Sequence, residues 1–199
     1  MQQNNQNIIR MRKRLFLLLL AFISLCQMDA VERTKLNFNG GWLLKVGDFP
    51  GAEQANYKDA GWKQITLPRA FNEKEAFKVS IEQLSDTIMW YRKHFHIQEV
   101  GDRKYFIEFE GVRFGADIWL NGKKVGYTEN GVMASGFDLT PYIIKGENVI
   151  AVRVDNSWSY RERATDQRYQ WNDKNFNANY GGIPKNVFLH ITDKLYQTL

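Results

Sequence analysis

Cysteine is almost absent from this sequence. Its 199 residues include one cysteine, Cys26, so no disulfide can form within the chain. The longest apolar run, from Leu15 to Leu25, is shorter than the about 20 residues that a transmembrane helix requires. The chain is also too short for an eight-stranded α/β barrel, which needs roughly 250 residues. These absences exclude a disulfide-linked scaffold, a membrane-spanning helix and a complete barrel enzyme.

The charge balance gives no support for a nucleic-acid partner. The formal net charge is +5, from 27 basic and 22 acidic side chains. Four of the basic residues lie at positions 10 and 12–14, in a segment that we expect to be removed, which leaves the mature protein near neutral. A nucleic-acid-binding domain instead concentrates lysine and arginine on one face. We therefore predict no nucleic-acid partner.

Residues 1–30 have the pattern of a leader with a secretory signal peptide. The basic n-region, residues 11–14, is followed by the apolar run from Leu15 to Leu25, and then by small or mixed residues up to Ala30. Because Met11 begins a complete leader of this kind, it is a candidate for the working start of the protein. We expect export to the periplasm or the medium, with cleavage at or near Ala30.

A lipoprotein anchor is the alternative interpretation of this leader. It depends on Cys26, the single cysteine, as the lipidated residue. The bulky Leu25 directly before it is a poor match to a lipobox, so ordinary cleavage is favoured. No transmembrane segment is predicted in either case.

Several stretches alternate apolar and polar side chains with the period of two that is typical of a β-strand with one face on a core. The pattern is clear in residues 87–97, 104–110 and 148–155. In the first of these, Tyr91 falls on one face, and Trp90 and Arg92 fall on the other. Because both faces are patterned, we expect this strand to lie in a sheet inside a sandwich.

A hairpin is predicted at the centre of the chain. Asn121-Gly122 separates residues 116–120 from residues 123–125, and this pair tolerates positive φ at both positions of a type I′ turn. Shorter strands are predicted at residues 38–46, 62–67 and 187–192. Four aromatic residues fall within the strand patterns and are predicted to pack in the core: Trp42, Trp90, Trp119 and Phe137. Many short strands with little helix predict an all-β antiparallel sandwich.

A series of short motifs carries a resemblance to a known family. The motifs are Asn39–Trp42, Trp90–Phe95, Glu110–Val112, Ala116–Gly122, Asp138–Thr140, Ala151–Asn156 and Gly181–Pro184. In this order they resemble the N-terminal sugar-binding domain of family 2 glycoside hydrolases, the β-galactosidase and β-glucuronidase type enzymes. The resemblance implies a jelly-roll, galactose-binding-like β-sandwich over residues 31–199. It also implies that the second sandwich and the catalytic barrel of the family are absent from this chain.

The resemblance implies two substrate-binding residues and no catalytic residue in this chain. The acid/base and the nucleophile of the family are glutamates of the barrel. Asp155 matches an aspartate that reaches into the active site of the neighbouring barrel in β-galactosidases, and Asp86 matches a galactose-contacting position less securely. From the residues alone, the favoured interpretation of Asp155 is a turn-forming residue at the end of a strand. Both interpretations stay open at this point.

Residues 157–183 form a long polar segment that is rich in aromatic residues. Loops longer than about 12–15 residues are uncommon in compact domains unless they are functional or disordered, and the aromatic content argues against disorder. We expect Asn156, Trp158, Trp171 and Tyr180 to contact either a sugar or the barrel.

Two pairs of side chains are of types that can take part in catalysis or in metal binding. Glu108 and Glu110 lie on one side of a strand about 6.6 Å apart, and a retaining glycosidase has two carboxyl groups about 5–5.5 Å apart. Nothing in the sequence supplies a cleft around them, so we interpret them as the solvated face of a strand. His94 and His96 are too few for a zinc site, which has three or four ligands, and His190 is remote in sequence. We predict no metal site or cofactor in this chain, although sodium or magnesium can serve the full enzyme.

The leading hypothesis is the sugar-binding domain of an exported retaining β-glycosidase, β-galactosidase-like, that hydrolyses O-glycosyl bonds in carbohydrate metabolism. Its partners are a β-linked oligosaccharide or glycan and the catalytic barrel of the parent enzyme. Since the sequence ends at Leu199, just after a strand, we expect a truncated reading frame or a fragment that is inactive alone. The alternatives are a free-standing carbohydrate-binding module and a purely structural sandwich that supports enzyme assembly.

Overall fold

The computed structural model describes residues 13, 33–70, 86–131, 133–168 and 181–196. The chain divides into two units, residues 1–32 and residues 33–199, and the fold described here is that of the second unit. The predicted signal peptide lies outside the described residues except for Lys13 and stays a prediction. In the part of the chain that the structure describes, no helix has the length and the apolar character to span a membrane.

The described residues form twelve β-strands. Their bounds are β1 (Thr34–Asn37), β2 (Trp42–Val46), β3 (Lys63–Ile65), β4 (Arg69–Ala70), β5 (Ile88–Ile97), β6 (Arg103–Phe109), β7 (Gly115–Leu120), β8 (Lys123–Thr128), β9 (Ser135–Asp138), β10 (Gly146–Asp155), β11 (Gly182–Ile183) and β12 (Val187–Asp193). Of the strands expected from the sequence, those over residues 87–97, 104–110, 148–155 and 187–192 are confirmed with shifts of one or two residues at their ends.

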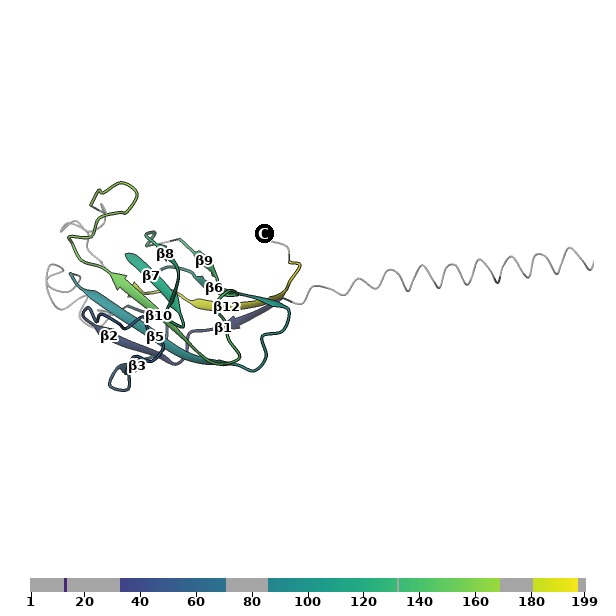
Figure 1. Ribbon diagram of the computed structural model, residues 1–199. Helices are drawn as coiled ribbons and strands as arrows, with labels where there is room; N and C mark the ends of the chain where they lie inside the picture. Colours follow the sequence, from purple (N-terminus) through teal and green to yellow (C-terminus); the bar gives the residue numbers. More distant parts are fainter. Residues whose placement is uncertain (1–12, 14–32, 71–85, 132, 169–180, 197–199) are drawn as a thin grey trace, which may run out of the picture. The chain divides into compact units, whose positions relative to one another are not determined.

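The strands form a sandwich of two antiparallel sheets. One sheet has the order β1-β12-β6-β9, and the other has the order β3-β2-β5-β10-β7-β8. Figure 1 shows the two sheets as layers, with β1, β6 and β12 in one and β2, β5 and β10 in the other. A third, two-stranded sheet pairs β11 with β4. The prediction of an all-β antiparallel sandwich is confirmed.

The main core lies between the two sheets. In β6, the buried Tyr105, Ile107 and Phe109 alternate with the less buried Phe106 and Glu108, as the pattern of two predicts. Side chains of the facing sheet complete this core, among them Trp42, Tyr91, Ile118, Val152 and Val154. Fully burying one such side chain contributes about 1.5–3 kcal/mol, so this core is the main source of stability.

The central hairpin is confirmed. Asn121 and Gly122 have φ values of 53° and 78°, the positive values that a type I′ turn requires. The side chain of Asn121 also fixes the turn to its surroundings, because its Nδ2 donates hydrogen bonds to Tyr142 O at 2.9 Å and to Asn148 Oδ1 at 2.8 Å. Its Oδ1 accepts the Val149 N–H at 2.9 Å.

A second apolar cluster lies on the other face of the six-stranded sheet. It consists of Ala52, Trp62, Trp90 and Ala151, with Trp119 stacked on Trp90 at a ring-centroid distance of 5.4 Å. Both faces of β5 are therefore covered, as the two patterned faces predict.

Arg92 lies on the same face of β5 as Trp90, and it is fully buried beneath residues 52–59. Its Nε donates to Asp59 Oδ2 at 2.7 Å, and its Nη1 donates to Gln54 O at 3.0 Å and to Ala52 O. A guanidinium carries five N–H donors, so it can be buried where carbonyl and carboxylate oxygens surround it. Arg92 thus holds the segment between β2 and β3 onto the sheet.

The small sheet β4/β11 is attached to β5 by Tyr91. The Tyr91 hydroxyl donates to Arg69 O and accepts the Ile183 N–H, both at 3.3 Å. Burial raises the pKa of Tyr91 far above its ordinary value, so this hydroxyl stays protonated. Gly182 packs directly against the ring, since a Cβ at this position would lie 2.1 Å from the hydroxyl oxygen.

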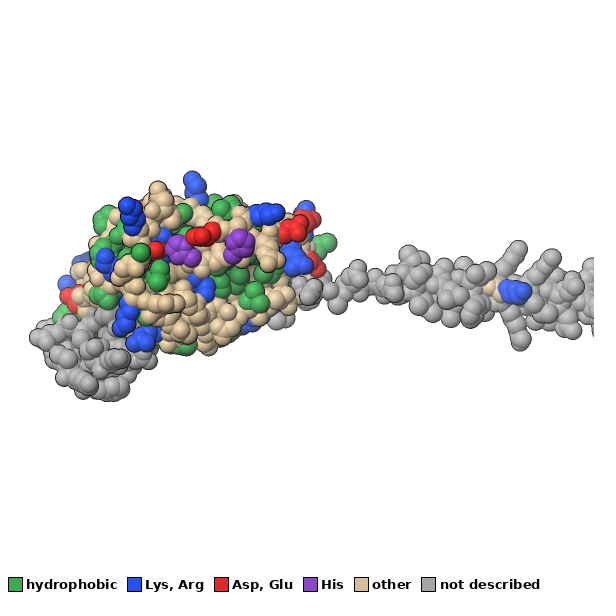
Figure 2. All heavy atoms as spheres, turned by 90° about the horizontal axis from the view of Figure 1, so that it is seen from below, with side chains coloured by type: hydrophobic (Ala, Val, Ile, Leu, Met, Phe, Trp, Pro, Cys, Tyr) green, Lys and Arg blue, Asp and Glu red, His purple; other side chains and the backbone are tan. Residues whose placement is uncertain are grey.

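The charged side chains of the described residues are mixed on the face that Figure 2 shows. Basic, acidic and histidine side chains lie there among apolar ones and exposed backbone. No large patch of one charge is visible on that face.

Candidate functional site

The candidate site lies at the end of the six-stranded sheet where β10 ends and β5 begins. Asp155, the last residue of β10, is paired with Ile88 of β5 and with Gly115 of β7. Asp86 lies two residues before β5, and the Asn156 N–H donates to Thr87 O at 3.0 Å. The antiparallel register therefore brings the two predicted substrate-binding aspartates to the same end of the sheet.

Asp155 is held by its own turn. Its Oδ1 accepts hydrogen bonds from the Ser157 N–H at 3.0 Å and the Ser157 Oγ–H at 2.6 Å. Its Oδ2 lies 3.5 Å from Arg153 Nη1, and the side chain is 17% exposed. One carboxylate oxygen of Asp155, Oδ1, thus makes the hydrogen bonds that the turn interpretation predicts. The other oxygen, Oδ2, lies beside Arg153, and a sugar hydroxyl can donate a hydrogen bond to it.

Arg153 is itself fixed by a bidentate pair with Asp48. The Arg153 Nε donates to Asp48 Oδ1 at 3.0 Å, and its Nη2 donates to Asp48 Oδ2 at 2.8 Å. The hydrogen bond from Arg153 lowers the pKa of Asp48 more than burial raises it, so the carboxylate stays ionised. Arg153 is consequently oriented with its remaining nitrogen toward Asp155.

Asp86 binds the backbone of the following loop. Its Oδ1 accepts the Trp158 N–H at 2.8 Å, while the carboxylate itself is exposed. Asp86 and Asp155 therefore fix neighbouring residues of one loop, Ser157 and Trp158. Trp158 is half-buried, and Asn156 is fully buried within the chain. The roles of these residues toward a sugar or a barrel stay predictions, and Trp171 and Tyr180 lie outside the described residues.

An ionic cluster that the sequence did not reveal holds residues 160–163 against β7 and β8. Arg163 Nη2 donates to Asp117 Oδ2 at 2.6 Å, and Lys124 Nζ lies 2.7 Å from Asp117 Oδ1. Glu129 accepts hydrogen bonds from the Tyr160 hydroxyl and, at 2.8 Å, from the Arg163 N–H. Burial raises the pKa of Asp117, but the hydrogen bonds from Arg163 and Lys124 outweigh it and hold the pKa below its ordinary value.

The ring of Tyr160 lies directly on Gly115. A Cβ atom at position 115 would come within 2.1 Å of the ring, which no real contact allows. Gly115 is also the residue paired with Asp155 across the sheet. The absence of a side chain at position 115 thus lets the loop pack close to the candidate site.

The two pairs considered from the sequence have other partners. His94 Nε2 lies 2.9 Å from Asp59 Oδ2, and His94 Nδ1 lies 2.8 Å from Glu147 Oε1. Burial lowers the pKa of His94, but these two carboxylates raise it by more. Among the described residues, no three histidine, cysteine, aspartate or glutamate side chains lie close enough together to hold a metal ion.

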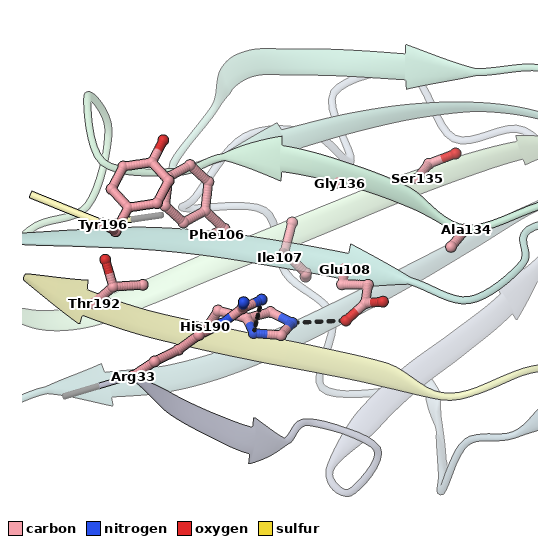
Figure 3. Close-up of a pocket in the computed structure, with 10 residues that line it drawn as sticks. All are labelled: Arg33, Phe106, Ile107, Glu108, Ala134, Ser135, Gly136, His190, Thr192 and Tyr196. Carbon is pink, nitrogen blue, oxygen red and sulfur yellow. Dashed lines mark hydrogen bonds and ion pairs between the residues drawn. The ribbon is translucent and has the colours of Figure 1, made fainter. Parts of the chain in front are cut away.

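Glu108 does not lie on an open strand face, so the expectation that no cleft surrounds it is wrong. It lines a pocket of about 400 Å³ (Figure 3) and accepts a hydrogen bond from His190 at 2.7 Å. The strand pattern could not show this pocket, because His190 lies 82 residues further along the chain. Glu110 is turned toward Asn186, whose Nδ2 donates to it at 2.8 Å.

Comparison with known proteins gives a consistent set of similarities. Residues 48–193 match the family model described as "Glycosyl hydrolases family 2, sugar binding domain". A β-glucuronidase of Formosa agariphila is 38% identical over 179 residues, which cover 84% of this chain and 18% of that protein. The β-galactosidase BoGH2A of Bacteroides ovatus is 33% identical over 133 residues, covering 63% of this chain and 16% of that protein.

The solved structures show the same similarity in three dimensions. A β-glucuronidase from glycoside hydrolase family 2 superposes with a TM-score of 0.71 at 35% sequence identity, covering 86% of this chain and 19% of that chain. A structure from Bacteroides cellulosilyticus, also of family 2, superposes with a TM-score of 0.62 at 29% identity, covering 80% of this chain and 21% of that one. The chain spans about a fifth or less of the length of these relatives.

Proposed function

Because this chain belongs to the sugar-binding domain family of the family 2 glycosyl hydrolases, we propose that it serves as the sugar-binding domain of a retaining β-glycosidase that cleaves terminal β-linked sugars. The match over residues 48–193 carries this proposal. The names of its relatives support a β-glucuronide or a β-galactoside as the substrate.

The residues of this chain would bind and orient the sugar, while the barrel of the parent enzyme supplies the two carboxylates of a retaining mechanism. In this proposal the Oδ2 atom of Asp155 accepts a hydrogen bond from a sugar hydroxyl. The Ser157 hydrogen bonds fix the rotamer of the carboxylate before the sugar arrives, so little conformational entropy is lost on binding. Asp86 holds Trp158 beside it, where the indole can cover an apolar face of the sugar.

A domain exchange tests the proposal. We expect the isolated chain to leave 4-nitrophenyl β-glucuronide and β-galactoside uncleaved, because it does not supply the catalytic pair of the barrel. Residues 33–196 should restore hydrolysis when they replace the matching domain of the Formosa agariphila β-glucuronidase, compared with that enzyme lacking the domain. The measurement is the release of 4-nitrophenol. The aryl glycoside that the chimera prefers shows which sugar class the domain suits.

Two outcomes of this experiment contradict the proposal. One is turnover by the isolated chain that follows it through purification. The other is a chimera that is folded by circular dichroism but cleaves neither aryl glycoside.

We also propose that the protein is exported, on the basis of the leader alone. The basic residues 12–14 and the apolar run that follows them support cleavage by a signal peptidase. N-terminal sequencing of protein from the periplasm or the medium should begin after Cys26, near Val31. A mature protein that begins at Met1 or Met11 in the cytoplasm contradicts export, and one that begins at Cys26 supports the lipoprotein alternative instead.

A further inference from the structure

A pocket of about 400 Å³ lies on the four-stranded sheet, away from the core between the sheets. Figure 3 shows side chains of β6 and β12 pointing into it, with Arg33 at one side and Tyr196 at the other. His190 and Thr192 alternate with the core-facing Leu189 and Ile191 along β12, yet they are only 5% and 3% exposed. An outward-facing sheet position is usually open to water. Because His190 and Thr192 are buried, neighbouring side chains must cover them and form the walls of the pocket.

A hydrogen-bonded row of polar side chains crosses the pocket. Arg33 Nη2 lies 3.3 Å from His190 Nδ1, and His190 Nε2 lies 2.7 Å from Glu108 Oε2. An arginine can only donate, so Nδ1 of His190 accepts and Nε2 carries the proton that is donated to Glu108. The two ring nitrogens of His190 thus connect Arg33 to Glu108.

Glu108 is ionised, and one of its two carboxylate oxygens is available to accept a hydrogen bond from a ligand. Burial raises its pKa, but the hydrogen bonds from His190 and Lys35 outweigh burial and hold the pKa below its ordinary value. Lys35 Nζ and His190 Nε2 both contact Oε2, at 3.1 and 2.7 Å. Within the described part of the chain, Oε1 accepts no hydrogen bond, and Figure 3 shows it turned away from His190.

Aromatic rings form the opposite wall. The rings of Phe106 and Tyr196 have centroids 5.1 Å apart with planes tilted by 55°. Tyr196 is 39% exposed, so part of its ring is available to a ligand. The pocket thus combines a charged acceptor, a cationic donor and an apolar ring surface within a volume that is large enough for a small ligand.

We propose that this pocket is a binding site for a neutral saccharide, with Arg33 and Glu108 contacting its hydroxyl groups and Tyr196 packing on its apolar face. A saccharide presents hydroxyl groups that donate and accept, next to C–H faces that pack on aromatic rings. The free Oε1 of Glu108 can accept a hydrogen bond from a hydroxyl group of a neutral saccharide but repels a carboxylate placed beside it, whereas Arg33 can donate to either ligand. The site lies on a different sheet from Asp155, and the inference does not depend on the proposed function.

The test is an NMR titration of the ¹⁵N-labelled full chain. The probes are lactose, a neutral β-linked disaccharide, and methyl β-D-glucuronide, an anionic monosaccharide. We expect lactose to shift the amide resonances of Glu108, His190 and Thr192, with a Kd of about 1 mM. The glucuronide should shift the same amides more weakly.

Two variants and two matched controls locate the site. Tyr196→Ala and Glu108→Gln should each weaken lactose binding by about tenfold, through loss of the ring and of the charge-assisted hydrogen bond. Leu195→Ala is the control for the first, because Leu195 is 85% exposed and does not line the pocket. Glu110→Gln is the control for the second, since Glu110 lies two residues further along and contacts Asn186 instead.

Three outcomes overturn the inference. The first is an unchanged spectrum at lactose concentrations well above the millimolar range. The second is a set of lactose-induced shifts at Asp155 and Trp158 instead of at the pocket. The third is a control variant that weakens lactose binding as much as the pocket variants do. Tyr196→Ala keeps the test decisive if Glu108→Gln fails to fold, because Tyr196 is a partly exposed residue outside the strands.

Discussion

Replacing Arg92 by methionine should lower the free energy of unfolding by about 3–5 kcal/mol, as expected when one partner of a buried ion pair is removed. Arg92 is fully buried, and its guanidinium donates to Asp59 Oδ2 and to main-chain carbonyls, including Gln54 O. Methionine fills similar space but leaves these acceptors without their donor. Urea unfolding of the variant and the parent protein, followed by tryptophan fluorescence, measures the difference.

Two further variants sharpen this prediction. Arg92→Lys keeps the charge, but three donors on a single nitrogen cannot reach acceptors that surround a planar guanidinium, so a smaller loss is expected. Arg161→Met is the control, because its pair with Asp166 is 3.6 Å long and both side chains are largely exposed. Such surface pairs contribute about 0–1 kcal/mol. A loss for Arg92→Met that is no larger than that of the control contradicts the assigned role.

Asp155→Asn, introduced into the chimeric enzyme, should lower kcat/KM by at least about tenfold, since each charge-assisted hydrogen bond contributes about 1.5–3 kcal/mol and 1.36 kcal/mol is tenfold in rate. The asparagine oxygen can still accept from Ser157, so the turn is kept. Its amide group, however, then faces Arg153 in place of Oδ2 and cannot accept from a sugar hydroxyl. Steady-state kinetics with the preferred aryl glycoside measure the change, and the unfolding midpoint should barely move.

Asp138→Asn is the matched control for this prediction. Asp138 ends β9 as Asp155 ends β10, and its Oδ1 accepts the Thr140 N–H at 2.8 Å in the same kind of turn. If Asp155 only caps its strand, the two variants should cost similar, modest stability and leave kcat/KM unchanged. That result removes Asp155 from the substrate site.

Local patterns in the sequence were sufficient where neighbouring residues decide the structure. Asn121-Gly122 specifies a turn by its backbone preferences, and the alternation in residues 104–110 specifies which side of β6 faces the core. By contrast, β1 was missed, because four residues at the edge of a sheet carry little pattern of their own. Its place is decided by pairing with β12 at the other end of the chain.

Contacts between distant residues account for what the sequence did not reveal. The alternation in β5 puts Arg92 on the same face as Trp90, but it does not show that residues 52–59 fold over that face and bury the guanidinium. The proximity of Asp86 and Asp155 follows from the register of β5 and β10, which no motif encodes. Likewise, Glu108 becomes part of a pocket through Arg33 and His190, which come from opposite ends of the described chain.

The contact between Tyr160 and Gly115 couples the side chains that positions 115 and 160 can hold. A side chain at position 115 and an aromatic ring at position 160 exclude each other, because a Cβ would lie 2.1 Å from the ring. A side chain can therefore replace Gly115 only if the loop after β10 takes another shape that moves Tyr160 away. Since position 115 is paired with Asp155, a change of this kind alters the shape of the loop directly beside the candidate site.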